Sequence, residues 1–333
     1  MAGVGDLANV ASVRDVTGRY FSLVSVLPSA LLAFYVFLLF ASGGWSGRPD
    51  FRRAANTILH LGLTGIFLLT VASIGVALVM HPLQFVLVQL LEGYWGASRL
   101  AEHARSFRMQ HHWQRANTLM QRRSQGEDEL EDRGELTDDE DLRGRMVLVS
   151  RIAEAGRLSQ FHLMDQKEAM PTRLGMVLRF YESLAGAPYG LNAIQVMPYM
   201  ARVAEADDMA YVNDQRSQLD LAVRMSVTAM FACVLTIVVL WRDGLWLLVA
   251  LPPYLVAYLS YRGAIVAAGQ YGQAVAVVIA LNRFALYERL HLPLPPTASA
   301  ERRAAGELAK SMDYNNTFAA TYHHPAPSPE GRS

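Results

Sequence analysis

The chain has 333 residues, and its 30 Lys and Arg residues are balanced by 30 Asp and Glu residues, so its formal net charge is zero. This balance argues against a dedicated nucleic-acid binder, which would carry a basic face, and we expect no nucleic-acid partner. The single cysteine, Cys233, excludes an intrachain disulfide and a cysteine metal cluster.

Four long apolar runs predict a membrane protein. They cover residues 21–43, 58–80, 225–241 and 245–261. Each is long enough, or nearly so, to cross a hydrocarbon layer roughly 30 Å thick as a helix. We therefore predict an all-α fold, a polytopic helical membrane protein with four transmembrane helices in two hairpins around a mainly helical cytoplasmic domain. The first run is longer than the core of a signal peptide, so we interpret it as a retained anchor.

Two shorter segments accompany the first hairpin, which spans residues 21–96. Residues 1–20 carry an apolar residue at every third position, which predicts either an interfacial helix or a frayed tail. After the second run, His81-Pro82 is expected to break the helix. Residues 82–95 then predict a separate interfacial helix, although a longer, tilted second span is the alternative. The expected anchors at headgroup level are Glu92, Tyr94 and Trp95.

Charge is unevenly distributed in the predicted cytoplasmic domain, residues 97–220. Residues 98–123 have a helical pattern and contain six arginines and one glutamate. Residues 126–141 contain ten acidic residues and one arginine. This acidic stretch has almost no apolar residue to bury, so it predicts a solvated, mobile linker.

The rest of this domain leads back to the membrane. Apolar residues return at helical spacing over 146–170 and predict an ordered segment. Gly and Pro punctuate residues 171–191, which predicts a turn-rich connection that fixes the domain to the membrane. Residues 194–221 are expected to enter the third span as a helix.

The second hairpin occupies residues 221–262, with a kink expected at Pro252-Pro253. Residues 263–281 are apolar enough for a fifth span, but glutamines and a tyrosine interrupt them. We favour a fourth span that continues as a packed helix over 263–296. Residues 297–333 are rich in Ala, Pro and Ser and predict a disordered tail.

Arginine counts near the span ends predict the orientation. Six arginines follow Trp95 within about thirty residues, and positive loops favour the cytoplasmic side. We therefore expect a multi-pass protein of the plasma (inner) membrane, with both termini and residues 97–220 in the cytoplasm.

Motifs for chemistry are absent from the sequence. It has no G-x-S-x-G, H-E-x-x-H or P-loop pattern, and the histidines of the basic helix lack the spacing of a metal site. We predict no enzyme, no cofactor and no metal, and hence no catalytic residue. Arginines of the cytoplasmic domain are the candidate contacts to lipid phosphates or to a partner protein, because guanidinium groups bind phosphate and carboxylate. These candidates are Arg99, Arg105, Arg108, Arg115, Arg173 and Arg179.

One stretch carries a family resemblance. It runs Pro171-Thr172-Arg173-Leu174-Gly175-Met176-Val177-Leu178-Arg179, followed by Glu182 and Tyr189-Gly190-Leu191. It resembles the P-T-R-L-G-N-x-L-R motif of an uncharacterised family of actinobacterial multi-pass membrane proteins. Three other segments are similar to the family: Pro82 to Trp95 after the second span, Tyr261 to Gly272 after the fourth, and Arg283-Phe284 with Leu292-Pro293-Leu294-Pro295 at its end. Met176, Pro188 and Asn192 depart from the family pattern. The resemblance implies the architecture and implies no activity.

These patterns favour a non-enzymatic, membrane-anchored scaffold or sensor whose cytoplasmic domain binds a protein partner or lipid headgroups. The alternative is an oligomeric channel or small-solute transporter, since small residues at 263–272 and Thr and Ser residues in the apolar runs would suit a pore. Buried charge, which would be expected for ion coupling, is lacking in the middle of the runs. A membrane enzyme ranks third. A homo-oligomer is left open.

Overall fold

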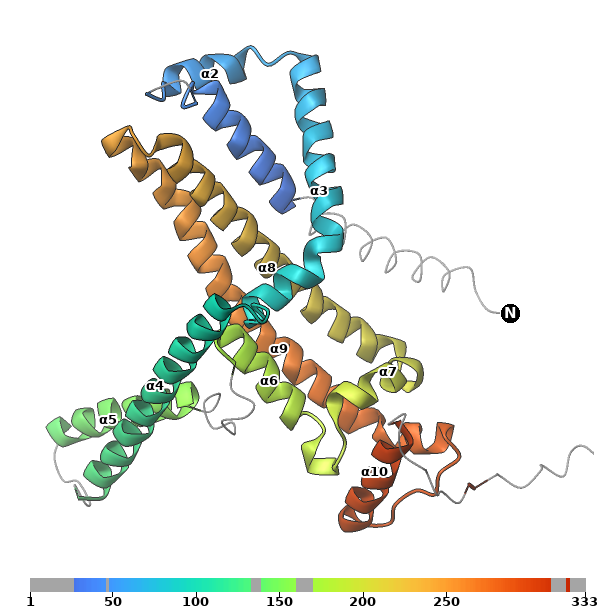
Figure 1. Ribbon diagram of the computed structural model, residues 1–333. Coiled ribbons are helices and arrows are strands. Elements are labelled where there is room, and N and C mark those ends of the chain that lie inside the picture. The colour runs from blue at the N-terminus through green and yellow to red at the C-terminus, as the bar shows by residue number, and fades with distance from the viewer. Residues whose placement is uncertain (1–26, 46–47, 133–138, 160–169, 313–321, 324–333) are drawn as a thin grey trace, which may run out of the picture. The chain divides into compact units, whose positions relative to one another are not determined.

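The computed structural model describes residues 27–45, 48–132, 139–159, 170–312 and 322–323, and every regular element among them is a helix (Figure 1). The predicted all-α class is therefore confirmed for this part of the chain. The predicted N-terminal segment, residues 1–20, lies outside it. After a first helix, Leu27–Ala41, the elements are α2 (Phe51–Leu59), α3 (Leu63–Glu92), α4 (Arg99–Asp132), α5 (Asp139–Ser159), α6 (Arg173–Leu184), η2 (Ala187–Tyr189), α7 (Ala193–Val203), α8 (Ala206–Leu240), η3 (Gly244–Ala250), α9 (Leu251–Arg289) and α10 (Ala298–Met312).

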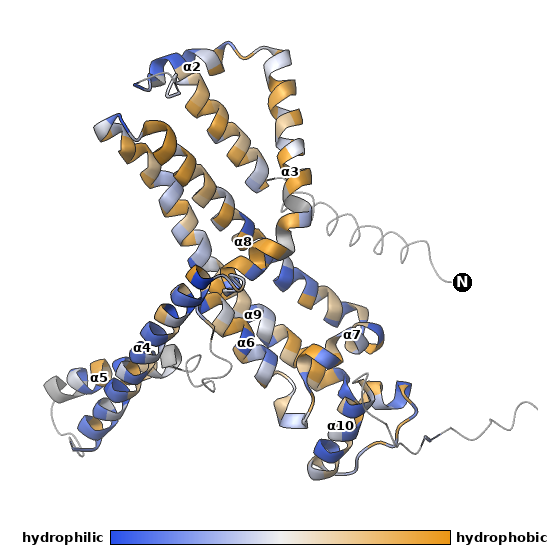
Figure 2. Ribbon diagram, in the orientation of Figure 1, coloured by the Kyte–Doolittle hydropathy of each residue, from blue (hydrophilic) through white to orange (hydrophobic). Residues whose placement is uncertain are grey.

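Two helical stretches are long and apolar enough to cross a membrane, Ala206–Leu240 and Gly244–Arg289. A third candidate is a bent pair, Arg52–Leu59 and Leu63–Val79, whose axes differ by 104°. The helix Leu27–Ala41 is apolar but shorter. Figure 2 shows this apolar character as orange segments along these helices. These features agree with a membrane protein.

The chain divides into two compact units. The first unit combines the described residues of 27–90 with residues 213–268. Inside it, the Tyr35 hydroxyl lies 2.7 Å from the Thr236 hydroxyl, and the Ser226 hydroxyl donates to the carbonyl of Ala257 at 3.1 Å. Gly44 lies against Leu240, so the ends of the helix Leu27–Ala41 and of α8 adjoin. These two helices therefore run in the same direction.

The helix α3 corrects the prediction of a break at His81-Pro82. It continues through Pro82 to Glu92, so residues 82–95 do not form a separate helix, and the alternative of a longer second helix is closer. Pro82 removes one backbone hydrogen bond. Apolar helices tolerate this loss because an unwound backbone would expose still more unsatisfied groups. The actual break comes earlier, at residues 60–62, between α2 and α3.

The second unit combines the described residues of 91–212 with those of 269–323. Its core surrounds one side of α9, where Ile279, Leu286 and Tyr287 are almost completely buried. Side chains from α7, α8 and α10, with two residues that lie between helices, complete this core. They are Ala185 of the α6 C-cap, Leu191, Ala193, Val196, Met200 and Val212, together with Ala305 and Leu308 of α10.

Three predicted segments of this unit need correction because tertiary packing orders them. The acidic linker 126–141 is wrong in part, since α4 extends to Asp132 and α5 begins at Asp139, while residues 133–138 lie outside the description. The turn-rich connection 171–191 is mostly the helix α6, and its N-cap is Thr172. The disordered tail 297–333 contains α10, although residues 313–321 and 324–333 are not described.

The remaining helix predictions are closer to the structure. A single helix, α9, covers residues 263–281 as expected and ends at Arg289. Pro252 and Pro253 lie in its first turn, where a missing N–H costs no intrahelical bond, and the preceding segment η3 is a 3-10 helix. The helix expected over 194–221 is divided between α7 and α8, with a break at Ala204 and Glu205.

Candidate functional site: the α4–α5 groove

The helices α4 and α5 form an antiparallel hairpin whose contact is made by small residues. Gly126 of α4 lies so close to α5 that a Cβ there would come within 2.7 Å of Ile152 Cγ1. Ala116 and Leu119 of α4 and Ala155 of α5 are also buried. Small side chains let the two helices approach closely at this seam, so longer side chains on either side border an open groove.

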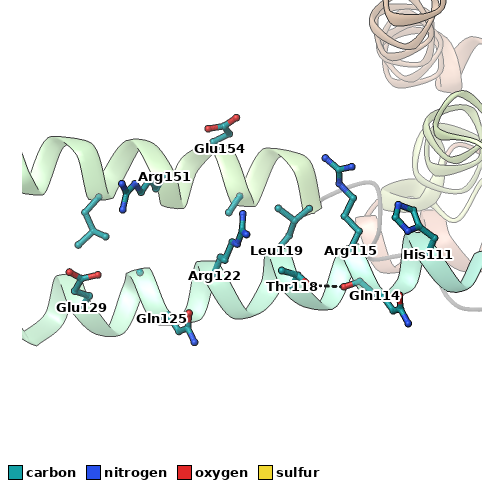
Figure 3. A pocket seen from close by; sticks show the side chains of 13 residues that line it. His111, Gln114, Arg115, Thr118, Leu119, Arg122, Gln125, Glu129, Arg151 and Glu154 are labelled. Carbon is teal, nitrogen blue, oxygen red and sulfur yellow. Dashed lines mark hydrogen bonds between the residues drawn. The ribbon is translucent and has the colours of Figure 1, made fainter.

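This groove has a volume of about 850 Å³ and lies along one side of the hairpin (Figure 3). Leu119, Leu148 and Ala155 supply its apolar floor. Its polar lining comes from both helices. It comprises His111, Gln114, Arg115, Thr118, Arg122, Gln125 and Glu129 of α4, and Arg151 and Glu154 of α5.

Three arginines and two glutamates line the groove, so the charge of its lining is positive. Arg115 and Arg122 are seven residues apart, which places them on the same side of α4 and about 10.5 Å apart along its axis. Figure 3 shows both reaching from α4 toward α5, while the carboxylate of Glu154 points away from α4. Arg151 adds a third guanidinium from α5. Within the described part of the chain, none of these three arginines has an ion pair.

The arrangement suits anion binding. Each guanidinium offers five N–H donors and remains charged at any physiological pH. Arginines pair with carboxylate or phosphate in bidentate geometry, so three of them along a groove can hold an extended anionic surface. Among the described residues there is no group of three His, Cys, Asp or Glu side chains that could hold a metal ion.

The predicted arginine contacts on α4 are spread around the helix. Arg115 lines the groove, whereas Arg99 and Arg108 are exposed outside its lining. Arg105 donates to the carbonyl of Gly96 at 3.2 Å, so it fixes the turn that precedes α4.

The two predicted contacts on α6 lie away from the groove. Arg179 pairs with Glu182 at 3.2 Å on the same helix. Arg173 is the first residue of α6 and is half-buried. The six arginines are therefore not brought together as one site.

Glu92, one of the predicted interface anchors, lies in a closely packed junction between the end of α3 and the start of α6. The Thr172 hydroxyl donates to the carbonyl of Glu92 at 2.8 Å and accepts from the N–H of Gly175 at 3.0 Å. A Cβ at Gly175 would lie 2.1 Å from the Glu92 oxygen, and one at Gly93 would lie 2.3 Å from Pro171 Cγ. The glycines are thus required by close backbone packing.

Further contacts complete the junction. His112 of α4 is buried, and its Nε2 donates to the carbonyl of Pro171 at 3.1 Å. Of the other two anchors, Tyr94 is exposed and Trp95 is half-buried. Burial raises the pKa of the Glu92 carboxyl, and the nearby charge of Glu182 raises it further.

Two groove residues, Arg122 and Arg151, were missing from the predicted contacts. Arg122 could have been found from its seven-residue spacing to Arg115, which is a helical signal. Arg151 could not, because its place opposite them depends on how α5 pairs with α4. A search of family models, of curated proteins and of solved structures finds no match to this chain.

Proposed function

We propose that this protein is a non-enzymatic, membrane-anchored scaffold whose α4–α5 hairpin binds an acidic helix of a partner protein. Four transmembrane helices in two hairpins would anchor it in the plasma membrane, with both termini and residues 97–220 in the cytoplasm. The observation that carries the proposal is the groove with its three guanidinium groups that lack an ion pair among the described residues.

The shape of the groove favours a helical partner. It runs along the two antiparallel helices for several turns and has an apolar floor between charged walls. An amphipathic helix binds such a groove with its apolar face down and its charged edges toward the walls. Glutamates or aspartates at seven-residue spacing would match Arg115 and Arg122, as in the charged edge positions of a coiled coil.

The first unit supports the membrane arrangement. The loops after Leu27–Ala41 and after α8 adjoin, and both carry exposed tryptophans, Trp45 and Trp241. Trp45 stacks on Phe40 with 5.5 Å between ring centroids, and the Arg242 guanidinium lies 4.7 Å from the Trp241 ring. Tryptophan beside arginine is typical of a helix end at headgroup level.

The channel alternative gains less support. The hydroxyls of Thr228 and Thr236 donate to carbonyls of their own helix, those of Arg224 and Ala232, each at 2.7 Å. The Ser226 hydroxyl donates to a carbonyl of α9. The Thr228 and Thr236 hydroxyls are thus paired within α8, and the Ser226 hydroxyl joins α8 to α9, so all three have partners inside the fold.

A binding measurement tests the scaffold proposal. The full chain in neutral-lipid nanodiscs would be titrated with a fluorescent helical peptide of about four heptads with glutamate at each seventh position. We expect binding that weakens as salt rises, and loss of at least about tenfold in affinity for R115E/R122E/R151E. The control R202E/R216E/R303E changes the same charge at exposed arginines outside the hairpin.

Three outcomes distinguish protein binding, lipid binding and channel activity. Equal binding by both variants would remove the groove from the proposal. Preference for anionic vesicles over the peptide would replace the protein partner with lipid headgroups. Solute flux in reconstituted vesicles without peptide binding would support a channel instead.

A further inference from the structure

The α4–α5 hairpin is a thin structure with little core of its own. The buried apolar side chains among its described residues are Ala101, Ala116, Leu119, Leu148 and Ala155. Large apolar residues stay exposed, including Phe107 at 71%, Trp113 at 53% and Val147 at 54%. A stable helical layer normally packs its apolar side on a further layer. The hairpin therefore presents a surface that needs a partner.

Charge on α4 is separated along the helix. Residues 99–123 contain six arginines and one glutamate, while residues 127–132 contain five carboxylates and no basic residue. The centres of these two blocks are about 25 Å apart along the axis. Within one chain, Arg123 pairs with Glu127 at 2.8 Å where the two blocks meet. The arginines from Arg99 to Arg115 lie further from the acidic block than the Debye length of about 8 Å at physiological salt, so this block does not neutralise them.

We propose that the acidic helix that occupies the groove is the end of α4 in a second copy of this chain, residues 127–132. This inference rests on the scaffold proposal that the groove binds an acidic helix, and it names that partner. A two-fold axis makes the contact reciprocal, since the same surface is used by both copies. Two hairpins joined in this way form an antiparallel four-helix bundle.

An antiparallel register centred near Gln125 meets the charge requirement. It places Arg122 opposite Asp128 of the second copy and Thr118 opposite Asp132 of the second copy. Gln125 lines the groove and carries no charge, so the two copies meet at the axis without like-charge repulsion. Gly126 lies beside it and keeps α5 close to α4. The acidic block 127–132 of each copy thereby lies opposite residues 118–123 of the other, which include Arg122 of the groove.

Charge reversal tests the dimer with the full chain in detergent. The groove variant is R115E/R122E/R151E, and the tip variant is D128R/E131R/D132R. We expect the wild-type chain to be dimeric by sedimentation at low salt, and each variant alone to self-associate at least about tenfold more weakly. An equimolar mixture of the two variants should restore a dimer with one copy of each, which also proves that both are folded.

Several results would overturn this inference. They are a monomeric wild-type chain, variants that still self-associate, or a mixture that stays monomeric. Peptide binding by a monomeric wild-type chain would reject the second copy while the scaffold proposal stands. A wild-type chain that neither binds the peptide nor dimerises would reject both the scaffold proposal and this inference.

Discussion

The junction between α3 and α6 yields the sharpest prediction, because its geometry leaves no room for a methyl group. In Gly175→Ala the new Cβ would lie 2.1 Å from the carbonyl oxygen of Glu92, so α6 must move away by about 1 Å. That movement also disrupts the hydrogen bond from the Thr172 hydroxyl to the same oxygen. The oxygen belongs to the backbone, so no side-chain rotation can relieve the contact.

The expected cost follows from three opposing effects. Overpacking of this kind costs about 1–3 kcal/mol, and the lost hydrogen bond costs about 1 kcal/mol. Alanine gains about 1 kcal/mol over glycine inside a helix. The net loss is about 1–3 kcal/mol, which should lower the melting temperature of the second unit by roughly 2–12 °C.

Thermal unfolding in detergent, followed by tryptophan fluorescence, measures this shift. The matched control is Gly306→Ala, because Gly306 is also helical and has nothing within 4 Å of the position of a Cβ. The control should leave the melting temperature unchanged or raise it slightly. If Gly175→Ala melts like the control, the close contact between α3 and α6 does not exist in solution.

Three further predictions concern other contacts. The raised pKa of Glu92 contributes stability at acidic pH, and this contribution disappears as pH rises through the folded-state pKa. Glu92→Gln should therefore raise the melting temperature at neutral pH and leave it unchanged at acidic pH. Thermal scans at the two pH values measure this difference. Arg283 pairs with the buried Glu301 at 2.7 Å. Glu301→Gln should therefore cost about 1–2 kcal/mol of stability and lower the hydrogen-exchange protection of α10. Unchanged protection would mean that the ion pair does not hold α10. Tyr35→Phe removes the 2.7 Å bond to Thr236 and should cost about 1 kcal/mol in a thermal scan, and no loss would indicate that the helix Leu27–Ala41 is held by packing alone.

Local patterns predicted helices well but failed where distant contacts decide the outcome. Pro82 follows the usual rule for a helix breaker, yet α3 continues through it because its apolar residues favour an unbroken backbone. Pro171 and Gly175 suggested turns, whereas they begin α6 and let it approach Glu92. Pro171 and Gly175 had the expected local preferences, but the residues that they contact, Gly93 and Glu92, lie about 80 residues earlier in the sequence.

Composition was misleading for the segments judged disordered. The tail looked too polar to fold, but Ala305 and Leu308 give α10 one apolar face, and the pair between Arg283 and Glu301 joins that helix to α9. The acidic stretch was also judged too polar, yet Gly126 packs on Ile152 of α5. For the groove, the spacing of Arg115 and Arg122 was visible in the sequence, while the position of Arg151 required knowledge of the hairpin.

The residues that carry the family resemblance and the residues of the groove lie in different places and have different physical roles. Pro171, Thr172 and Gly175 pack against Glu92 and Gly93, so these motif residues form a junction between helices. Such packing residues constrain architecture and carry no information about a ligand. The groove arginines of α4 and α5 lie outside that motif and line an open surface. Under the scaffold proposal, partner recognition therefore belongs to the charged α4–α5 groove, and the junction between α3 and α6 serves the architecture.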